Sequence, residues 1–259
     1  MTDRSKTISP CGPRPALQPG PAQPCPACGG TIPGQARGVT DRYGWSWSLH
    51  TCYRCGVQYQ ARPMTDEARR DFYASGRYRQ VCAQVTGQPW DDPEYLRQAQ
   101  QVYAETWVDV DRLNIPRIIH ARWLDYGGST GTVSAIFSSY YDPTVAVTVA
   151  DYGDGAKTTP EQALAVPDAT YDAILCCQTL DHLPGPLNTL RAFLRVAKPG
   201  ARLFVDVVKL AHTAYKLDHD TYYPSGSAFL ALVERSGWTP LWLDAETHPT
   251  HYSILAEKA

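Results

Sequence analysis

Residues 120–131 read His-Ala-Arg-Trp-Leu-Asp-Tyr-Gly-Gly-Ser-Thr-Gly, and this stretch decides the fold. A short apolar strand at Trp123 and Leu124 runs into the acidic residue Asp125, and three glycines follow around a tight loop. A helix is predicted to begin at once, over residues 132–139. Glycines remove the Cβ atoms that would keep a ligand from the backbone, and a helix start offers unpaired N–H groups. The stretch therefore predicts the nucleotide-binding turn of an α/β sheet.

The acidic strand end sets this turn apart from a dinucleotide site. A dinucleotide would place its pyrophosphate on the unpaired N–H groups, whereas Asp125 favours a cationic or amine-bearing ligand. A second apolar strand, 145–150, ends in Asp151, 26 residues after Asp125. In α/β nucleotide folds an acidic side chain at this strand tip accepts hydrogen bonds from ribose hydroxyls. Two alternatives stay open: a tight strand–helix turn without a ligand, and a solvated acid at position 151.

The rest of the chain alternates strands with helices. A continuous apolar run at 171–178 is typical of a strand buried on both faces. The helical spacing of the next segment ends at Lys198-Pro199-Gly200. The other predicted elements are helices at 65–74 (starting at Thr65), 93–107, 187–196 and 227–235, and strands at 202–208, 240–243 and 252–256.

The glycine loop resembles the first motif of class I S-adenosylmethionine (SAM)-dependent methyltransferases. Their motif reads acidic-x-Gly-x-Gly-x-Gly, and residues 125–131 match it except that Ser129 replaces the middle glycine. Residues 195–203 resemble the "R-x-L-K-P-G-G" crossing of the same enzymes. The resemblance implies a Rossmann-like α/β domain over 110–259 with a seven-stranded sheet. It also implies a lid over the SAM cleft, which would lie in residues 63–109.

The same resemblance assigns cofactor-binding roles. It implies that Asp151 binds the SAM ribose and that the glycine loop holds the methionine part. The implied SAM-binding residues are Asp125, Gly127, Gly128, Ser129, Gly131, Asp151 and Gln178.

Two Cys-x-x-Cys-Gly turns precede this domain. Cys25 and Cys28 form the first turn, Cys52 and Cys55 the second, and 23 residues separate them. Such turns point two thiolates at one ion, and two of them complete a tetrahedral site. The spacing predicts a structural Zn²⁺ in a zinc-ribbon lobe over residues 25–62. A redox pair or a disulfide framework is disfavoured because neither a βαβ pattern nor a signal peptide accompanies the cysteines.

The catalytic chemistry is expected at the carboxyl end of the strand at 171–178. Gln178 is followed closely there by Asp181 and His182. Histidine suits proton abstraction near neutrality, and Asp181 could orient it. The alternative is a structural acid–His pair that shapes the cofactor site. No Asn/Asp-Pro-Pro-Tyr/Phe motif follows the strand, which disfavours base amines and protein amides as methyl acceptors.

Residues 216–224 resemble a loop of bacterial sugar C-methyltransferases and their small relatives, which also carry an N-terminal four-cysteine zinc lobe. The resemblance makes His219 and Tyr222 substrate-side candidates for catalysis, together with Tyr73 and Tyr78. Two departures weaken it. Asp181 replaces the usual Glu, and the chain ends where the sugar enzymes continue into a further domain.

Composition limits the choice of partners. The 259 residues carry 24 Lys and Arg against 26 Asp and Glu, a net charge of −2, which argues against charge-driven nucleic-acid binding. No apolar stretch is long enough to predict a membrane helix. The thiols and the metal-type spacing indicate a reducing cytoplasm. Six prolines in residues 1–24 predict a disordered arm.

Three functions remain open. The first is a SAM-dependent methyltransferase acting on a small molecule, such as a sugar nucleotide or a specialised metabolite. The second is a methyltransferase for RNA or protein, whose substrate binds the zinc lobe and a basic face. That face would contain the arginines at positions 62, 69, 70, 77 and 79. The third is a non-catalytic SAM-fold subunit, which Ser129 in the glycine loop would favour.

Overall fold

The structure is a computed structural model that describes most of the chain. Nearly all of the proline-rich arm and the predicted substrate-side residue His219 lie outside the described residues. The described ranges are 24–31, 35–40, 46–60, 62–107, 120–141, 144–153, 156–209, 222–244 and 250–259.

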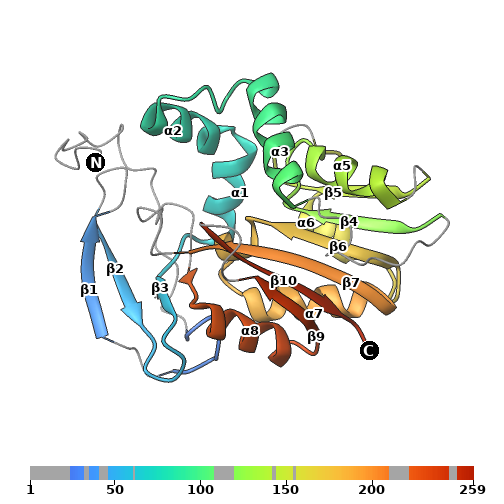
Figure 1. Cartoon of the computed structure of the whole chain (residues 1–259). Helices are drawn as coiled ribbons and strands as arrows, with labels where there is room; N and C mark the ends of the chain where they lie inside the picture. Colours follow the sequence, from blue (N-terminus) through green and yellow to red (C-terminus); the bar gives the residue numbers. More distant parts are fainter. Residues whose placement is uncertain are drawn as a thin grey trace.

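A mixed six-stranded sheet forms the centre of the molecule (Figure 1). The first four strands across it are parallel, and β10 is antiparallel to both of its neighbours. The predicted seventh strand is absent from the described residues; beyond β5 there is an isolated parallel bridge between Ala150 and Thr158. In spatial order the strands are β5 (Ala146–Ala150), β4 (Arg122–Tyr126), β6 (Tyr171–Cys177), β7 (Ala197–Val208), β10 (His251–Glu257) and β9 (Thr239–Asp244).

Helices cover both faces of this sheet, as the apolar strands require. Alternate residues of β6 point to opposite faces, so Ile174 packs in one core and Leu175 in the other. The Leu175 face is covered by α3 (Pro93–Trp107) and α5 (Thr132–Tyr141), and the Ile174 face by α6 (Pro160–Leu164), α7 (Pro186–Val196) and α8 (Gly226–Arg235).

Each element predicted from periodicity is present within a few residues of its expected bounds. The Thr65 side chain caps α1 (Asp66–Ala74) by accepting a hydrogen bond from the Ala68 N–H at 3.2 Å. Helix α2 (Arg77–Thr86) was not predicted. Its N-cap is Gly76, which makes no side-chain capping bond, so the sequence lacks the usual start signal.

The cysteine-containing lobe is a small antiparallel sheet beside the main domain (Figure 1). Its strands β1 (Gln35–Thr40), β2 (Ser46–Thr51) and β3 (Gln58–Gln60) are joined by β8 (Tyr222–Tyr223), which pairs with β3. Strand β8 belongs to the segment that follows β7. The lobe predicted over 25–62 is therefore completed by a strand from the predicted methyltransferase domain.

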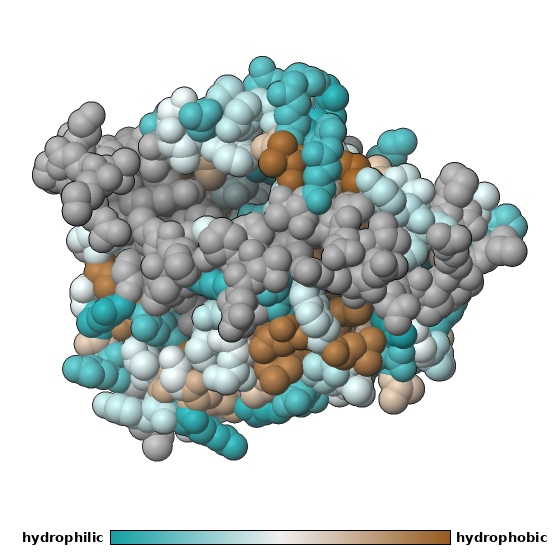
Figure 2. Space-filling view, in the orientation of Figure 1, coloured by the Kyte–Doolittle hydropathy of each residue, from teal (hydrophilic) through white to brown (hydrophobic). Residues whose placement is uncertain are grey.

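Residues 62–92, which we call the cap, contain α1 and α2 and lie over the carboxyl end of the central strands. A small core of Met64, Phe72 and Val81 holds the cap together, and Trp47 of β2 packs against it. Hydrophilic side chains gather on the outer surface above α2 and α3 (Figure 2). In the described part of the chain, no helix combines the length and apolarity that crossing a bilayer requires.

Candidate active site

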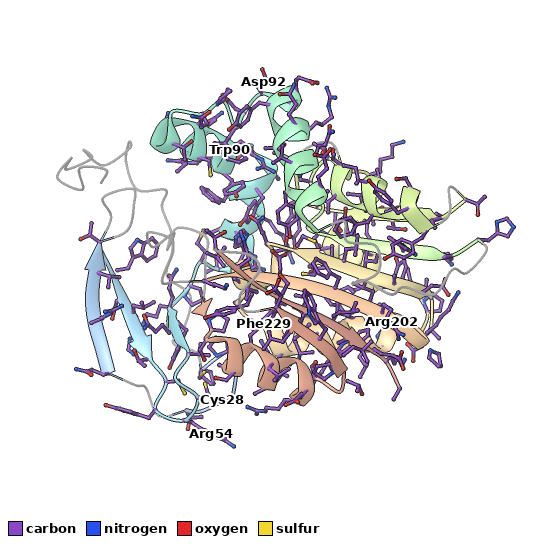
Figure 3. The ribbon with its side chains drawn as sticks, viewed as in Figure 1. Cys28, Arg54, Trp90, Asp92, Arg202 and Phe229 are labelled. Carbon is purple, nitrogen blue, oxygen red and sulfur yellow. The ribbon has the colours of Figure 1, made fainter. Side chains whose placement is uncertain are left out.

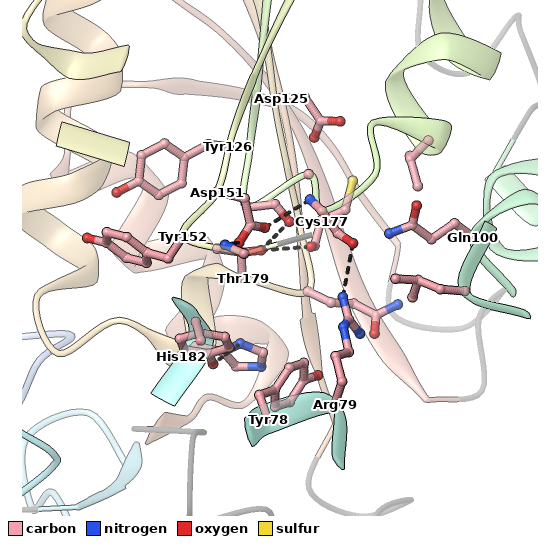
Figure 4. A pocket seen from close by; sticks show the side chains of 18 of the residues that line it. Tyr78, Arg79, Gln100, Asp125, Tyr126, Asp151, Tyr152, Cys177, Thr179 and His182 are labelled. Carbon is pink, nitrogen blue, oxygen red and sulfur yellow. Dashed lines mark hydrogen bonds between the residues drawn. The ribbon is translucent and has the colours of Figure 1, made fainter. Parts of the chain in front are cut away.

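A cavity of about 270 Å³ lies between the cap and the carboxyl ends of β4, β5 and β6 (Figure 4). Most of the predicted site residues line it: Asp125, Gly127, Gly128, Ser129, Asp151, Gln178 and His182. Gly131 and Asp181 do not line it. The backbone of Tyr222 lies in β8, paired with Tyr59, but its side chain is outside the described residues.

The glycines of the loop are required by close packing within the protein. A Cβ on Gly127 would lie 2.1 Å from Thr179 Oγ1, and a Cβ on Gly128 would lie 2.3 Å from the carboxyl carbon of Asp125. Gly131 has φ +75°, and a Cβ there would meet Val149 at 2.8 Å. Larger residues at these positions would distort the floor of the cavity. Gly131 therefore allows the turn to pack against Val149 but does not line the cavity itself.

Asp125 is buried at the end of β4 and accepts a hydrogen bond from the Ser134 hydroxyl at 2.5 Å. Burial raises the pKa of Asp125 to about 6, because the charged form loses hydration. The carboxylate therefore lacks a full compensating charge at neutral pH. A ligand ammonium group would supply one, as the sequence predicts.

This raised pKa predicts a pH-dependent affinity for S-adenosylhomocysteine (SAH). Protonation below about pH 6 removes the negative charge that attracts the ligand ammonium, whereas above about pH 7 the carboxylate is already ionised. We expect the dissociation constant to be flat above pH 7 and to rise about tenfold per pH unit well below pH 6. Calorimetric titrations from pH 5 to 8 measure it. An Asp125→Asn variant should bind SAH weakly at every pH. If its SAH affinity depended on pH as strongly as that of the wild type, Asp125 would not be the group that binds the ligand ammonium.

Asp151 and Ser129 are joined at the floor of the cavity. The Asp151 carboxylate accepts hydrogen bonds from the Ser129 N–H at 2.9 Å and from the Gly153 N–H at 3.1 Å. Ser129 has φ +52°, a conformation that costs a non-glycine residue energy. Its hydroxyl accepts a hydrogen bond from Arg79 of the cap at 3.0 Å (Figure 4). The serine that departs from the glycine motif therefore has a structural partner.

Gln178 at the end of β6 also has a left-handed backbone, with φ +49°. Its N–H donates to the carboxylate of Asp206 at 2.9 Å. Burial raises the pKa of Asp206 to about 7. Gln178 and Ser129 are two of four described non-glycine residues with positive φ, and both line the cavity, where strained backbone is typical of functional positions.

His182 lies between the cap and a buried acid. Its Nδ1 is 3.1 Å from the Tyr73 hydroxyl, and the two rings are stacked with their centroids 6.3 Å apart. The carboxylate of Asp181 lies 3.9 Å from His182 Nε2 and accepts a hydrogen bond from the Val208 N–H at 3.3 Å. Asp181 is fully buried and does not line the cavity, so it is not placed to touch a ligand there. The geometry suits a positioned base, and the catalytic role stays a prediction.

The cap supplies wall residues that the sequence did not mark as parts of a cofactor or catalytic site. Arg69, Arg79 and Trp90 line the cavity, as does Cys82. Arg69 and Arg79, two of the five arginines of the predicted basic face, line the cavity, and Arg70 pairs with Glu161 of α6 at 3.0 Å. No local pattern reveals these contacts, since they join residues 50 to 109 positions apart.

The four predicted zinc ligands form one cluster. Their sulfur atoms all lie within 4.8 Å of one another, with Cys25–Cys55 and Cys28–Cys52 separations of 3.6 and 3.5 Å. Zn–S bonds of about 2.3 Å in a tetrahedron give sulfur separations of this size. Burial raises the pKa of Cys25, and also that of Cys55 to about 11. A cation is therefore needed to hold these groups as thiolates.

The two cysteine turns have the same backbone conformation. In the first, the Cys25 N–H donates to the Gly30 carbonyl and the Gly29 N–H donates to the Cys25 carbonyl. The second repeats these bonds from Cys52 to Val57 and from Gly56 to Cys52. Gly29 and Gly56 have φ of +67° and +71°, which explains the glycine after each pair. The donor set and the paired turns fit a structural Zn²⁺ with no open coordination position.

The fold and the acidic, glycine-lined cavity are those of the SAM-dependent methyltransferase class. A family model described as "Methyltransferase domain" matches residues 93–257, more than half of the chain. The chain therefore belongs to the methyltransferase domain family. The match begins at α3, so the cysteine-containing lobe and the cap lie outside it.

Similar proteins support this classification. The chain is 36% identical over 58 residues to the ubiquinone biosynthesis O-methyltransferase of Aeromonas salmonicida, covering 22% of this chain and 24% of that protein. The protein of the same name from Xylella fastidiosa is 39% identical over 57 residues, covering 22% and 23%. Each alignment thus spans about a quarter of the relative.

A similar fold is seen in the crystal structure of 1,6-didemethyltoxoflavin-N1-methyltransferase from Burkholderia thailandensis. That structure contains bound 1,6-didemethyltoxoflavin and SAH. The identity is 16%, the TM-score is 0.52, and the alignment covers 80% of this chain and 97% of that one. None of these three proteins is a sugar C-methyltransferase by name, so that resemblance stays a prediction.

Proposed function

We propose that the cavity binds SAM and that the protein transfers its methyl group to a small molecule, such as a sugar nucleotide or a specialised metabolite. The observation that carries this proposal is the meeting of Asp125, the glycine loop and Asp151 in one capped cavity. Two acids on its floor suit the ammonium and ribose hydroxyls of SAM. When bound, SAM supplies an electrophilic methyl group.

The residues that line the cavity would have separate roles in SAM binding and in proton transfer. Asp125 accepts hydrogen bonds from the ligand ammonium, Asp151 from the ribose, and the loop backbone allows close approach. Tyr73 and His182 both line the cavity, so a proton leaving the acceptor can pass to the Tyr73 oxygen while that hydroxyl gives its own proton to His182 Nδ1. The cap shields the reacting groups from water.

A small acceptor is favoured over RNA or protein by two features. Tyr73 and Tyr78 of the cap lie beside His182 at the cavity, and Arg69 and Arg79, two of the five arginines of the predicted basic face, line this cavity. The curated relatives named above are also O-methyltransferases of a small-molecule pathway by name. The hypothesis of a non-catalytic subunit rested on Ser129 in place of a motif glycine. Ser129 accepts a hydrogen bond from Arg79 of the cap, so this departure has a structural reason and does not favour that hypothesis.

Two further proposals accompany this function. Cys25, Cys28, Cys52 and Cys55 hold a Zn²⁺ that stabilises the lobe and takes no part in methyl transfer. The seven described cysteines form no disulfide with one another, which supports a reducing compartment such as the cytoplasm.

Calorimetric titration with SAH tests the function. We expect micromolar binding to the wild type and about a 10- to 100-fold loss in Asp151→Ala, the effect of removing a charged hydrogen-bonding group. His182→Ala should still bind SAH, because its proposed role concerns the acceptor.

The matched control is Asp91→Ala, which removes a solvent-exposed carboxylate. It should bind SAH as the wild type does. Absence of SAH binding by folded, zinc-containing wild-type protein would overturn the proposal.

A further inference from the structure

Arg69 is a buried cation with incomplete pairing. The residue lies on α1, is only 9% exposed and lines the cavity. Its Nη2 pairs with Asp66 at 2.9 Å, but the Asp66 side chain is 66% exposed. The Nε and Nη1 atoms are buried and have no hydrogen-bond partner among the described residues. A buried guanidinium with two unused donors is costly unless a ligand completes its hydrogen bonds.

A second residue of the cap also has an unused donor at the cavity. Trp90, between α2 and α3 (Figure 3), also lines the cavity, and its indole N–H is buried without a partner in the described ranges. The opposite floor carries the carboxylates of Asp125 and Asp151. The cavity thus has an acidic floor and a donor-rich roof, which suits a ligand pair with a cationic and an anionic part.

Two observations indicate which ligand Arg69 would bind. Arg79 is the guanidinium that contacts the glycine loop, where the methionine end of SAM is proposed to lie. Arg69 instead lines the cavity together with Tyr126 and Tyr152 and makes no recognised contact with the glycine loop among the described residues. It also lies in the cap, outside the family match that begins at residue 93. A residue that the family domain does not include is suited to recognise the acceptor of this particular protein.

We propose that Arg69, assisted by the Trp90 N–H, binds an anionic group of the methyl acceptor, either a carboxylate or a phosphate. The guanidinium fork matches both groups through paired hydrogen bonds. This inference rests on the proposed methyltransferase function and narrows its substrate class to acidic small molecules. The other possible source of the anion is the carboxylate of SAM itself.

The experiment uses inorganic phosphate as the probe, titrated calorimetrically into SAH-saturated protein. We expect wild-type protein to bind phosphate, Arg69→Gln to bind it at least about tenfold more weakly, and Arg69→Lys to keep part of the affinity. Arg70→Gln is the matched control: Arg70 is the next residue on α1, its side chain is half exposed, and it pairs with Glu161. This control should bind phosphate as the wild type does. Arg69→Lys keeps the charge and guards against a folding defect in Arg69→Gln.

Separate titrations identify the source of the anion. Equal phosphate binding by wild type and Arg69→Gln, or no phosphate binding by the wild type, would overturn the inference. So would an Arg69→Gln variant that loses SAH affinity yet binds 5′-methylthioadenosine normally, because that ligand lacks the amino-acid carboxylate. Failure of the wild type to bind SAH would reject the proposed function itself and is observed before any phosphate is added.

Discussion

Replacing Cys28 with serine should release the bound zinc and lower the melting temperature by about 10 °C or more. Zinc binding by four thiolates contributes about 10–16 kcal/mol in small zinc domains, and that energy is folding energy. Each kcal/mol corresponds to about 2–4 °C in a chain of this size. Metal analysis should find one Zn²⁺ per wild-type chain and none in the variant.

The loss is expected to spread beyond the lobe because the lobe is attached to the main domain at several points. Arg235 of α8 donates hydrogen bonds to the carbonyls of Ala27 and Cys28 at 3.3 and 3.1 Å (Cys28 is labelled in Figure 3). Strand β8 pairs with β3, and Trp47 packs against the cap. Thermal denaturation followed by tryptophan fluorescence would report the whole transition.

Cys82→Ser is the control for the metal prediction. Cys82 is buried but lies in the cap, outside the sulfur cluster. This variant should keep its zinc and lose little stability. Wild-type protein that contains no metal, or a Cys28→Ser variant with unchanged zinc content and melting temperature, would show that the cluster is not a zinc site.

A Gly128→Ala substitution should reduce SAH affinity by about 100-fold or more. The new Cβ would lie 2.3 Å from both the carboxyl carbon and Oδ2 of Asp125, a separation that no pair of non-bonded atoms adopts. Either the loop or the carboxylate must move. Such overpacking costs about 1–3 kcal/mol, and a displaced charged hydrogen bond costs about 1.5–3 kcal/mol. Calorimetry with SAH measures the loss.

Gly38→Ala is the matched control for this glycine. Gly38 lies on β1, and a Cβ there would have nothing within 4 Å. This variant should bind SAH as tightly as the wild type. If Gly128→Ala also binds normally, the loop does not hold the ligand against Asp125.

The turn at 120–131 predicted the correct fold because its signal is local. The strand, the acidic residue, the glycines and the helix follow one another within 20 residues. The buried strand at 171–178 was also recognisable, because helices cover both of its faces and both faces are therefore apolar. The same locality explains the prediction of the cysteine cluster, in which each turn is built from a six-residue segment.

The parts that were not predicted depend on contacts between distant residues. The inward direction of Arg69 and Arg79 follows from how the cap sits on the sheet, and charge alone suggested a surface face instead. Strand β8 has two residues and no pattern of its own. The missing seventh strand is represented by one bridge, from Ala150 to Thr158, in the described residues. The sequence could not predict these features because tertiary packing decides them.

The attachment of the cap has a kinetic consequence. The side-chain contacts that join it to the family domain include Arg70 with Glu161, Tyr73 with His182 and Arg79 with Ser129. The last two join residues that line the cavity. We expect opening of the cap to limit the release of a bound nucleoside, so weakening either of these two contacts should shorten its residence time even where equilibrium affinity changes little.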